Sequence, residues 1–141
     1  MITALDHIAV AVPDLEKAIE RFCEDFGLPL GGTEDVIQAK TTAAFLPLPP
    51  TSIELVHPLN DEGPVKAYLE KKGGGLHHLC FRMRAREDVE ELHQFLQETG
   101  VTIVHGPQED GWAPGYYSVL FEDPEGIRLE ANFVPGKGLL A

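Results

Sequence analysis

Two stretches, LDHIAVAV at residues 5–12 and LHHLCFRM at residues 76–83, repeat one pattern and decide the fold. A shift of 71 residues superposes them and places His7 on His78. A second shift, of 76 residues, places AFLPLPPTSIEL at 44–55 on LFEDPEGIRLEA at 120–131 without a gap, so that Glu54 falls on Glu130. Because both matches occur in the same order, we infer that the chain is a tandem duplication.

A helix is predicted after the first strand of each copy, because apolar residues recur there at helical spacing. Asp14 is a suitable cap for the first helix, and the glycines at 27 and 100 are typical helix stops. The apolar positions are Leu15, Ala18, Ile19, Phe22 and Phe26 in the first copy, and Val89, Leu92, Phe95 and Leu96 in the second. Each copy therefore reads as a strand, a helix and a hairpin.

The segment NDEGPVKAYLEKKGGG, residues 60–75, separates the two copies. Proline favours the first turn of a helix and glycine its end, so the segment is predicted to be a short linker helix that begins at Pro64. We expect one domain over residues 1–141, with a first module at about 3–59, the linker at about 60–75 and a second module at about 76–135.

Alternation along the strands sorts their two faces. In the first strand of the chain, Ile8, Val10 and Val12 share one face, and Leu79, Phe81 and Met83 share the corresponding face of the second copy. The helices are expected to cover these apolar faces, which gives an α+β fold. The opposite faces carry four polar residues, which are His7, Glu54, His78 and Glu130. Polar side chains at these positions indicate a site on the uncovered, concave side.

Two imidazoles and two carboxylates form a mixed nitrogen and oxygen set that suits Zn, Ni, Co, Mn or Fe(II). Four protein ligands leave room for water or substrate only on an ion with more than four ligands, which favours Ni, Co or Mn over closed tetrahedral Zn. Taken singly, a strand histidine is more often satisfied by a neighbour, and a lone glutamate is often a surface charge. The paired positions of all four residues favour a metal site.

The composition limits the other classes of function. The proportions of 43% apolar and 24% charged residues are those of a soluble folded protein, and no apolar run approaches the roughly 20 residues of a membrane span. The net charge of −12 argues against a nucleic-acid partner. Two cysteines, Cys23 and Cys80, without a secretory signal are expected to be free thiols in the cytoplasm.

The stretches LDHIAVAVPDLEKAIERF, IEL, GLHHL and IRLE together resemble the vicinal oxygen chelate superfamily, which includes glyoxalases, bleomycin resistance proteins and dioxygenases. The resemblance implies two βαβββ modules that form a cupped mixed sheet around a metal site, with helices on the outer face. It also implies that His78 is a metal ligand whereas His77 points away, and that the protein is a homodimer.

Residues 44–81 resemble methylmalonyl-CoA epimerases most closely. This resemblance implies a metal-dependent epimerase that removes a proton beside the thioester of an acyl-CoA through an enediolate. The C-terminal stretch YYSVLFEDPEGIRLEANF is more similar to lactoylglutathione lyases (glyoxalase I), which act on a glutathione hemithioacetal. The His, Glu, His, Glu ligand order is also that of bacterial glyoxalase I. A drug-binding protein without catalysis is a third alternative, disfavoured by the complete ligand set, and an extradiol dioxygenase ranks below it.

For an epimerase, the duplication predicts that Glu130 and Glu54 approach a planar intermediate from opposite faces and exchange protons with it. The alternative is that both glutamates are only ligands. Some epimerases of the family carry a second base at a position that matches Thr42, which cannot serve as one. Arg82 shares the strand face of His78, and the sequence leaves open whether it binds a substrate carboxylate or is a surface residue.

Overall fold

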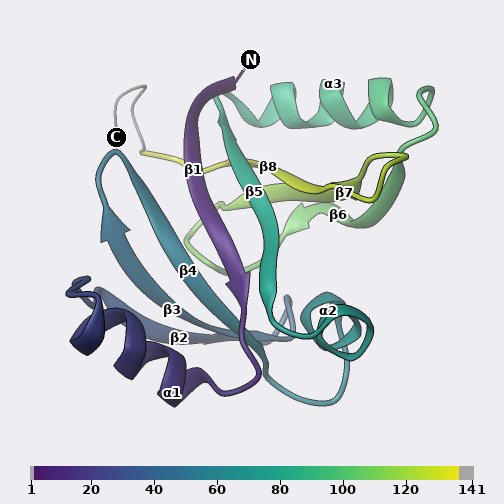
Figure 1. The fold of residues 1–141 in the computed structure, drawn as a ribbon. Helices are drawn as coiled ribbons and strands as arrows, with labels where there is room; N and C mark the ends of the chain where they lie inside the picture. The colour runs from purple at the N-terminus through teal and green to yellow at the C-terminus, as the bar shows by residue number, and fades with distance from the viewer. Residues whose placement is uncertain (1, 137–141) are drawn as a thin grey trace. The chain divides into compact units, whose positions relative to one another are not determined.

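The structure, a computed structural model, describes residues 2–136, which form two compact units. The amino-terminal unit comprises residues 7–77, and the carboxy-terminal unit comprises residues 2–6 together with residues 78–136. The first strand, β1 (Ile2–Ala11), contributes residues to both units (Figure 1).

The strands of the amino-terminal unit follow the order β2-β3-β4-β1. Strands β2 (Gly32–Val36), β3 (Thr41–Leu48) and β4 (Thr51–Pro58) are antiparallel to one another, whereas β1 and β4 are parallel. The unit also contains α1 (Leu15–Glu20), which continues as one turn of π-helix, η1 (Arg21–Asp25), and α2 (Pro64–Lys72), which packs beside β4. A parallel pair requires a crossover connection, and α1 with β2 and β3 supplies it.

The apolar face of this unit is the predicted one. The backbone N–H of Lys17 donates to Asp14 Oδ1 at 3.1 Å, so the predicted cap of the first helix is confirmed. The helical segment ends before Gly27, whose φ of +78° suits glycine. Residues of α1 and η1 pack against the strands around a core of Val12, Ala44, Leu46 and Leu55, with Val10, Leu15, Ala18, Ile19, Phe22, Cys23, Leu28 and Ile53 at its margin.

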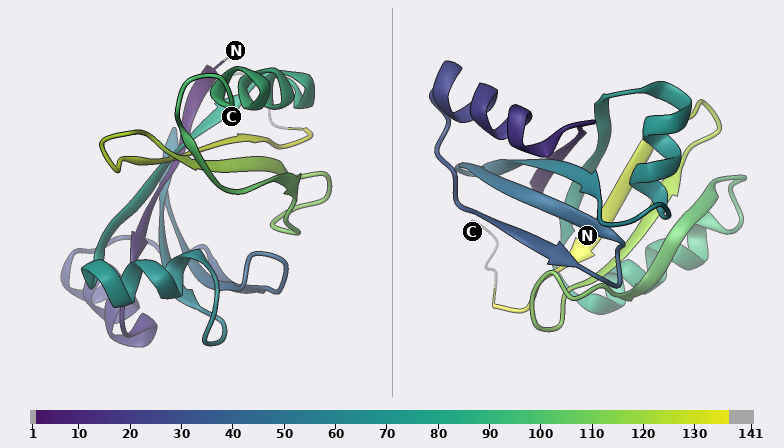
Figure 2. Two further views of the ribbon diagram at one scale, coloured as in Figure 1. Left: turned by 90° about the vertical axis from the view of Figure 1, so that its right-hand side faces the viewer. Right: turned by 90° about the horizontal axis from the view of Figure 1, so that it is seen from below.

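The strands of the carboxy-terminal unit follow the order β5-β8-β7-β6. Strands β5 (Gly75–Met83) and β8 (Arg128–Phe133) are parallel, and β7 (Tyr117–Glu122) is antiparallel to both β8 and β6 (Thr102–Glu109). Helix α3 (Arg86–Leu96) packs along β6, β7 and β8 (Figure 2). The core beneath it contains Met83, Val89, Leu96, Tyr117, Val119, Phe121 and Ala131.

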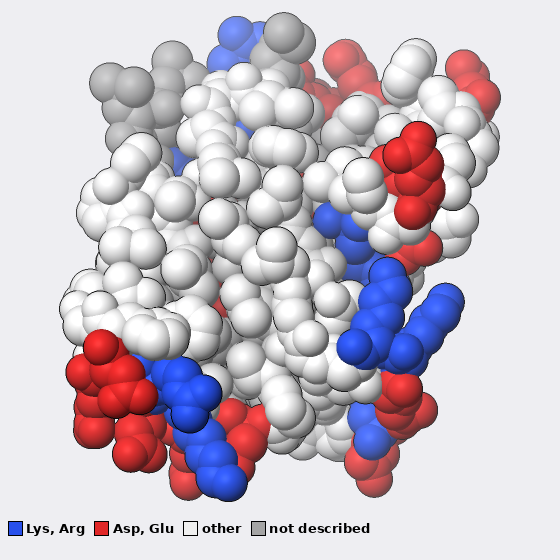
Figure 3. All heavy atoms as spheres, in the orientation of Figure 1, with Lys and Arg blue, Asp and Glu red and all other residues white. Residues whose placement is uncertain are grey.

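The two units repeat one order of elements, in which a strand is followed by a helix, an antiparallel strand pair and a last strand parallel to the first. This confirms the α+β class, with eight strands and three α-helices among residues 2–136. In the same residues, no helix is both long and apolar enough to cross a membrane. Acidic and basic side chains are mixed where α1 faces the viewer in Figure 3. The module bounds and the placement of a metal in a cup stay predictions.

Candidate metal centre

The first predicted pair, His7 and Glu54, is brought together in the amino-terminal unit. His7 Nδ1 lies 3.0 Å from Glu54 Oε2, and the two side chains are 4% and 12% exposed. The register explains the contact: Glu54 on β4 pairs with Ala9 of β1, and His7 lies two residues before Ala9 on the same face. The opposite face of these strands carries the apolar core, so the strand pairing itself presents both polar groups on the uncovered side.

The second predicted pair, His78 and Glu130, forms the same arrangement in the carboxy-terminal unit. His78 Nε2 lies 3.0 Å from Glu130 Oε1, and the side chains are 11% and 9% exposed. Glu130 on β8 pairs with Cys80 of β5, and His78 lies two residues before Cys80. The duplicated sequence has therefore produced a duplicated histidine–glutamate pair, each built from the first and last strand of its copy.

The neighbouring His77 belongs to the other face of the strand. Its ring packs edge-to-face against Tyr68 with 5.0 Å between the ring centroids, and the residue is buried. His77 therefore packs against Tyr68, and the assignment of His78 as the ligand stays a prediction.

The sequence analysis did not identify the buried Tyr116, which contacts Glu130. Its hydroxyl donates a hydrogen bond to Glu130 Oε2 at 2.8 Å. Tyr117 faces the core under α3, so alternation sends the adjacent Tyr116 to the face of Glu130. The tyrosine pair at the start of β7 was the only available signal, and it does not specify a partner.

These donors suit a divalent ion. In each unit, an imidazole nitrogen and a carboxylate oxygen are already 3.0 Å apart and largely removed from solvent. Nitrogen and oxygen donors of this type bind Zn, Ni, Co and Mn.

Residues 4–131 match the family model described as the Glyoxalase/Bleomycin resistance protein/Dioxygenase superfamily. The chain belongs to this superfamily. It is 36% identical over 126 residues to the ethylmalonyl-CoA/methylmalonyl-CoA epimerase of Cereibacter sphaeroides, a match that covers 89% of this chain and 91% of that protein. The resemblance to the vicinal oxygen chelate superfamily is thereby confirmed, and its epimerases are among the relatives.

Solved structures of the superfamily share the fold. The crystal structure of methylmalonyl-CoA epimerase from Mycobacterium tuberculosis is 26% identical, with a TM-score of 0.78, and the match covers 94% of this chain and 88% of that one. A variant of Streptomyces coelicolor methylmalonyl-CoA epimerase in complex with 2-nitronate-propionyl-CoA has a TM-score of 0.82 at 22% identity and matches 96% of this chain and 100% of that one. This second likeness shows the fold.

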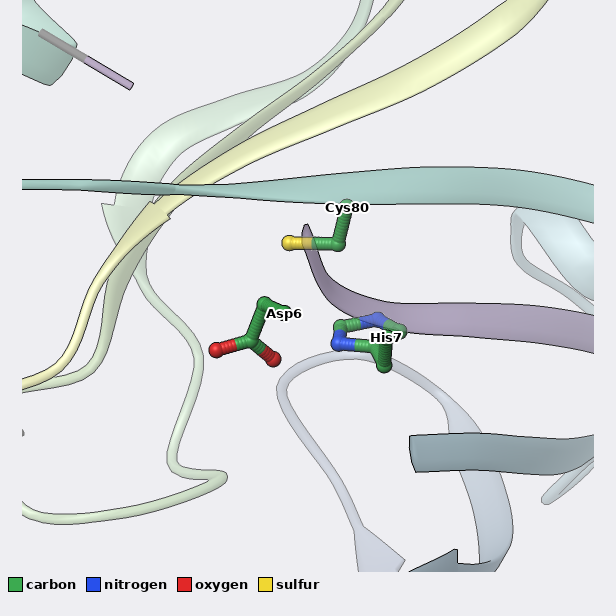
Figure 4. A group of neighbouring side chains, drawn as sticks. All are labelled: Asp6, His7 and Cys80. Atoms are coloured by element: carbon green, nitrogen blue, oxygen red, sulfur yellow. The ribbon is translucent and has the colours of Figure 1, made fainter. Parts of the chain in front are cut away.

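Arg82 is buried in this protein. The sequence analysis had left open whether it binds a substrate carboxylate or is a surface residue. Its Nη2 and Nε atoms lie 2.8 Å and 2.9 Å from Asp6 Oδ2, within the carboxy-terminal unit. The alternative of a surface arginine is therefore wrong. Figure 4 shows the carboxylate of Asp6 on β1 and the thiol of the buried Cys80 on β5. Because Asp6 already neutralises a buried guanidinium, it is a poor additional metal ligand.

Thr42, which the sequence analysis excluded as a second base, lies on the core-facing side of β3. Thr42 shares the face of Ala44 and Leu46, which belong to the core under α1, and its hydroxyl donates to Asp35 Oδ1 at 2.9 Å. Glu54 instead pairs with Phe45, on the opposite face of β3. A base at position 42 would point away from Glu54. The two β3 neighbours of Phe45 on the face of Glu54, Ala43 and Pro47, carry no acid–base group.

Proposed function

We propose that this protein is a divalent-metal-dependent epimerase that inverts the configuration at C2 of methylmalonyl-CoA. One observation carries the proposal. Two histidine–glutamate pairs with the same contact distance, each with one buried and one mostly buried member, occur in a chain that resembles a known ethylmalonyl-CoA/methylmalonyl-CoA epimerase over 89% of its length. The substrate is accordingly an acyl-CoA thioester.

We infer that His7, Glu54, His78 and Glu130 hold one ion. The nitrogen and oxygen donors favour Co, Ni or Mn, which accept more than four ligands, and Zn is the remaining candidate. When bound, the ion supplies a Lewis acid that stabilises negative charge as it develops beside the thioester carbonyl.

Glu130 is the proposed base that removes the C2 proton of the substrate. A positioned carboxylate that transfers a proton typically contributes about 10²–10⁴-fold to the rate. The other copy supplies Glu54 for the opposite face of the planar enediolate. For the step to balance, Glu54 starts in the protonated form and gives its proton to C2 while Glu130 keeps the proton it removed, and exchange with solvent then resets both groups. Inversion requires loss on one face and return on the other, and two glutamates related by duplication meet that requirement. Under the alternative, both glutamates serve only as ligands.

The runner-up is lactoylglutathione lyase (glyoxalase I), which acts on a glutathione hemithioacetal. Two observations favour it: the His, Glu, His, Glu order of the ligand set and the C-terminal stretch at residues 116–133. Its chemistry also begins with proton removal beside a carbonyl, so the same glutamates would serve. A non-enzymatic drug-binding protein is the alternative of another class, and a complete set of four ligands argues against it.

We further propose that the protein acts in the cytoplasm as a homodimer. The net charge of −12 disfavours a nucleic-acid partner and an anionic membrane surface, because both repel an acidic protein.

A substrate comparison tests the proposal. The metal-free protein is reconstituted separately with Co²⁺, Ni²⁺, Mn²⁺ and Zn²⁺, and each form is assayed with methylmalonyl-CoA and with the methylglyoxal–glutathione hemithioacetal. We expect epimerisation of the thioester and little turnover of the hemithioacetal. Fast hemithioacetal turnover with an untouched thioester would establish the runner-up. Inactivity of every metallated form with both substrates would contradict both enzyme assignments.

A further inference from the structure

We propose that Tyr116 is a positioning residue that fixes one oxygen of Glu130 and thereby controls how this carboxylate binds metal and accepts a proton. The inference rests on the proposed function only for its activity readout. Its structural basis lies entirely in the carboxy-terminal unit, where Tyr116 and Glu130 are both buried.

The two oxygens of Glu130 have different partners. Oε2 accepts the hydrogen bond of the Tyr116 hydroxyl at 2.8 Å, and Oε1 lies 3.0 Å from His78 Nε2. A hydroxyl that donates to a carboxylate forms a charge-assisted bond, roughly twice as strong as a neutral one. The phenol therefore directs Oε2 toward itself and leaves Oε1 on the side of the histidine ligand.

A constrained turn places the tyrosine. The backbone N–H of Tyr116 donates to the carbonyl of Ala113 at 3.0 Å, which closes a turn just before β7. Gly115 in this turn has a φ of +73°, and a Cβ added to it would lie 2.7 Å from Pro135 Cγ. Both the conformation and the close approach of Pro135 require glycine. The position of Tyr116 is thus set by backbone geometry rather than by a mobile loop.

The tyrosine reaches Glu130 across a buried row of the sheet. Glu130 pairs with Leu120 of β7, and the intervening row on this face is formed by Ser118 and its partner Asn132. Ser118 and Asn132 are 2% and 0% exposed. A phenol that spans this row keeps water from the carboxylate, where a hydrogen bond is worth more than in solvent.

The first copy lacks this arrangement. The shift of 76 residues that superposes Glu130 on Glu54 places Tyr116 on Lys40. The Lys40 amine lies 3.4 Å from Glu62 Oε2. Tyr116 therefore distinguishes two glutamates that the duplication would otherwise make equivalent, and it marks Glu130 as the carboxylate with the fixed orientation.

The variant Tyr116→Phe removes only the hydroxyl, and Tyr116→Met is a second variant without it. Tyr117→Phe is the matched control, because it deletes the adjacent hydroxyl from the core face under α3, where burial raises the pKa of the Tyr117 phenol. Co²⁺ affinity is measured by competition with a chelator, the Co²⁺ absorption spectrum is recorded, and kcat and KM for methylmalonyl-CoA are determined. Circular dichroism melts of the metal-free proteins establish that each variant folds.

We expect both Tyr116 variants to bind Co²⁺ about 10–100-fold more weakly, as is typical when a hydrogen-bond partner of a ligand is lost. The Co²⁺ spectrum should shift, and kcat should fall more than KM changes, while the Tyr117 control matches wild type. Wild-type Co²⁺ affinity and spectrum in folded Tyr116→Phe would overturn the inference. If the affinity falls as expected but wild type does not epimerise methylmalonyl-CoA, the positioning role stands and the proposed function fails.

Discussion

The buried ion pair between Asp6 and Arg82 allows a stability prediction with a defined magnitude. Two guanidinium nitrogens lie 2.8 Å and 2.9 Å from one carboxylate oxygen, and the side chains are only 8% and 12% exposed for Arg82 and Asp6. The variant Asp6→Asn leaves a buried guanidinium without its counter-charge, which typically costs about 3–5 kcal/mol. For a chain of this length, a loss of 3 kcal/mol lowers the melting temperature by about 10 °C.

A double-mutant cycle separates this cost from the net contribution of the pair. Urea unfolding of wild type, Asp6→Leu, Arg82→Met and the double variant with both substitutions gives the four free energies of unfolding, and Asp6→Asn is measured beside them. We expect each single variant to be strongly destabilised and the apolar combination to recover most of the loss, because it leaves no unpaired buried charge. A change of less than about 1 kcal/mol in Asp6→Asn would show that the guanidinium is solvated, contrary to the burial described above.

Two further predictions concern the metal and the assembly. His7 and His78 are proposed ligands on the uncovered strand faces, so His7→Ala and His78→Ala should each bind much less divalent metal than wild type. Both variants should keep the circular dichroism spectrum of the wild type. Equal metal content by elemental analysis in all three proteins would show that the site is misassigned. The proposed homodimer should have twice the chain mass in light scattering at assay concentration, and a strict monomer would remove that proposal.

Much of the fold could be predicted from the sequence because the pattern in one copy could be checked against the pattern in the other. A helical or strand pattern in one copy is ambiguous, but the same pattern in both copies, with His7 on His78 and Glu54 on Glu130, is not. Alternation then assigned Val10 and Val12 to the helix-covered face, where the structure places them. The ligand pairs followed from the same alternation, since first and last strands of each copy are parallel neighbours.

The remaining features depend on side-chain contacts that the periodicity of apolar residues in the sequence does not reveal. Arg82 meets Asp6 76 residues away in the sequence, and charge patterns along a single strand do not reveal such a partner. Tyr116 reaches Glu130 because a glycine turn against Pro135 aims it along the sheet. Thr42 illustrates another limit: a match by resemblance does not say which face of a strand a residue occupies, and a shift of one residue exchanges the two faces.

Deuterium exchange at C2 tests the central claim most directly. The metal-loaded protein is incubated with methylmalonyl-CoA in deuterated water, and incorporation at C2 is followed by mass spectrometry for wild type and for Glu130→Gln, with metal content measured in the same samples. Proton transfer by Glu130 predicts that wild type incorporates solvent deuterium and that Glu130→Gln, in samples shown by the metal analysis to be loaded, does not. Exchange at the wild-type rate in metallated Glu130→Gln would contradict the role of Glu130, and no exchange in metallated wild type would contradict the epimerase itself.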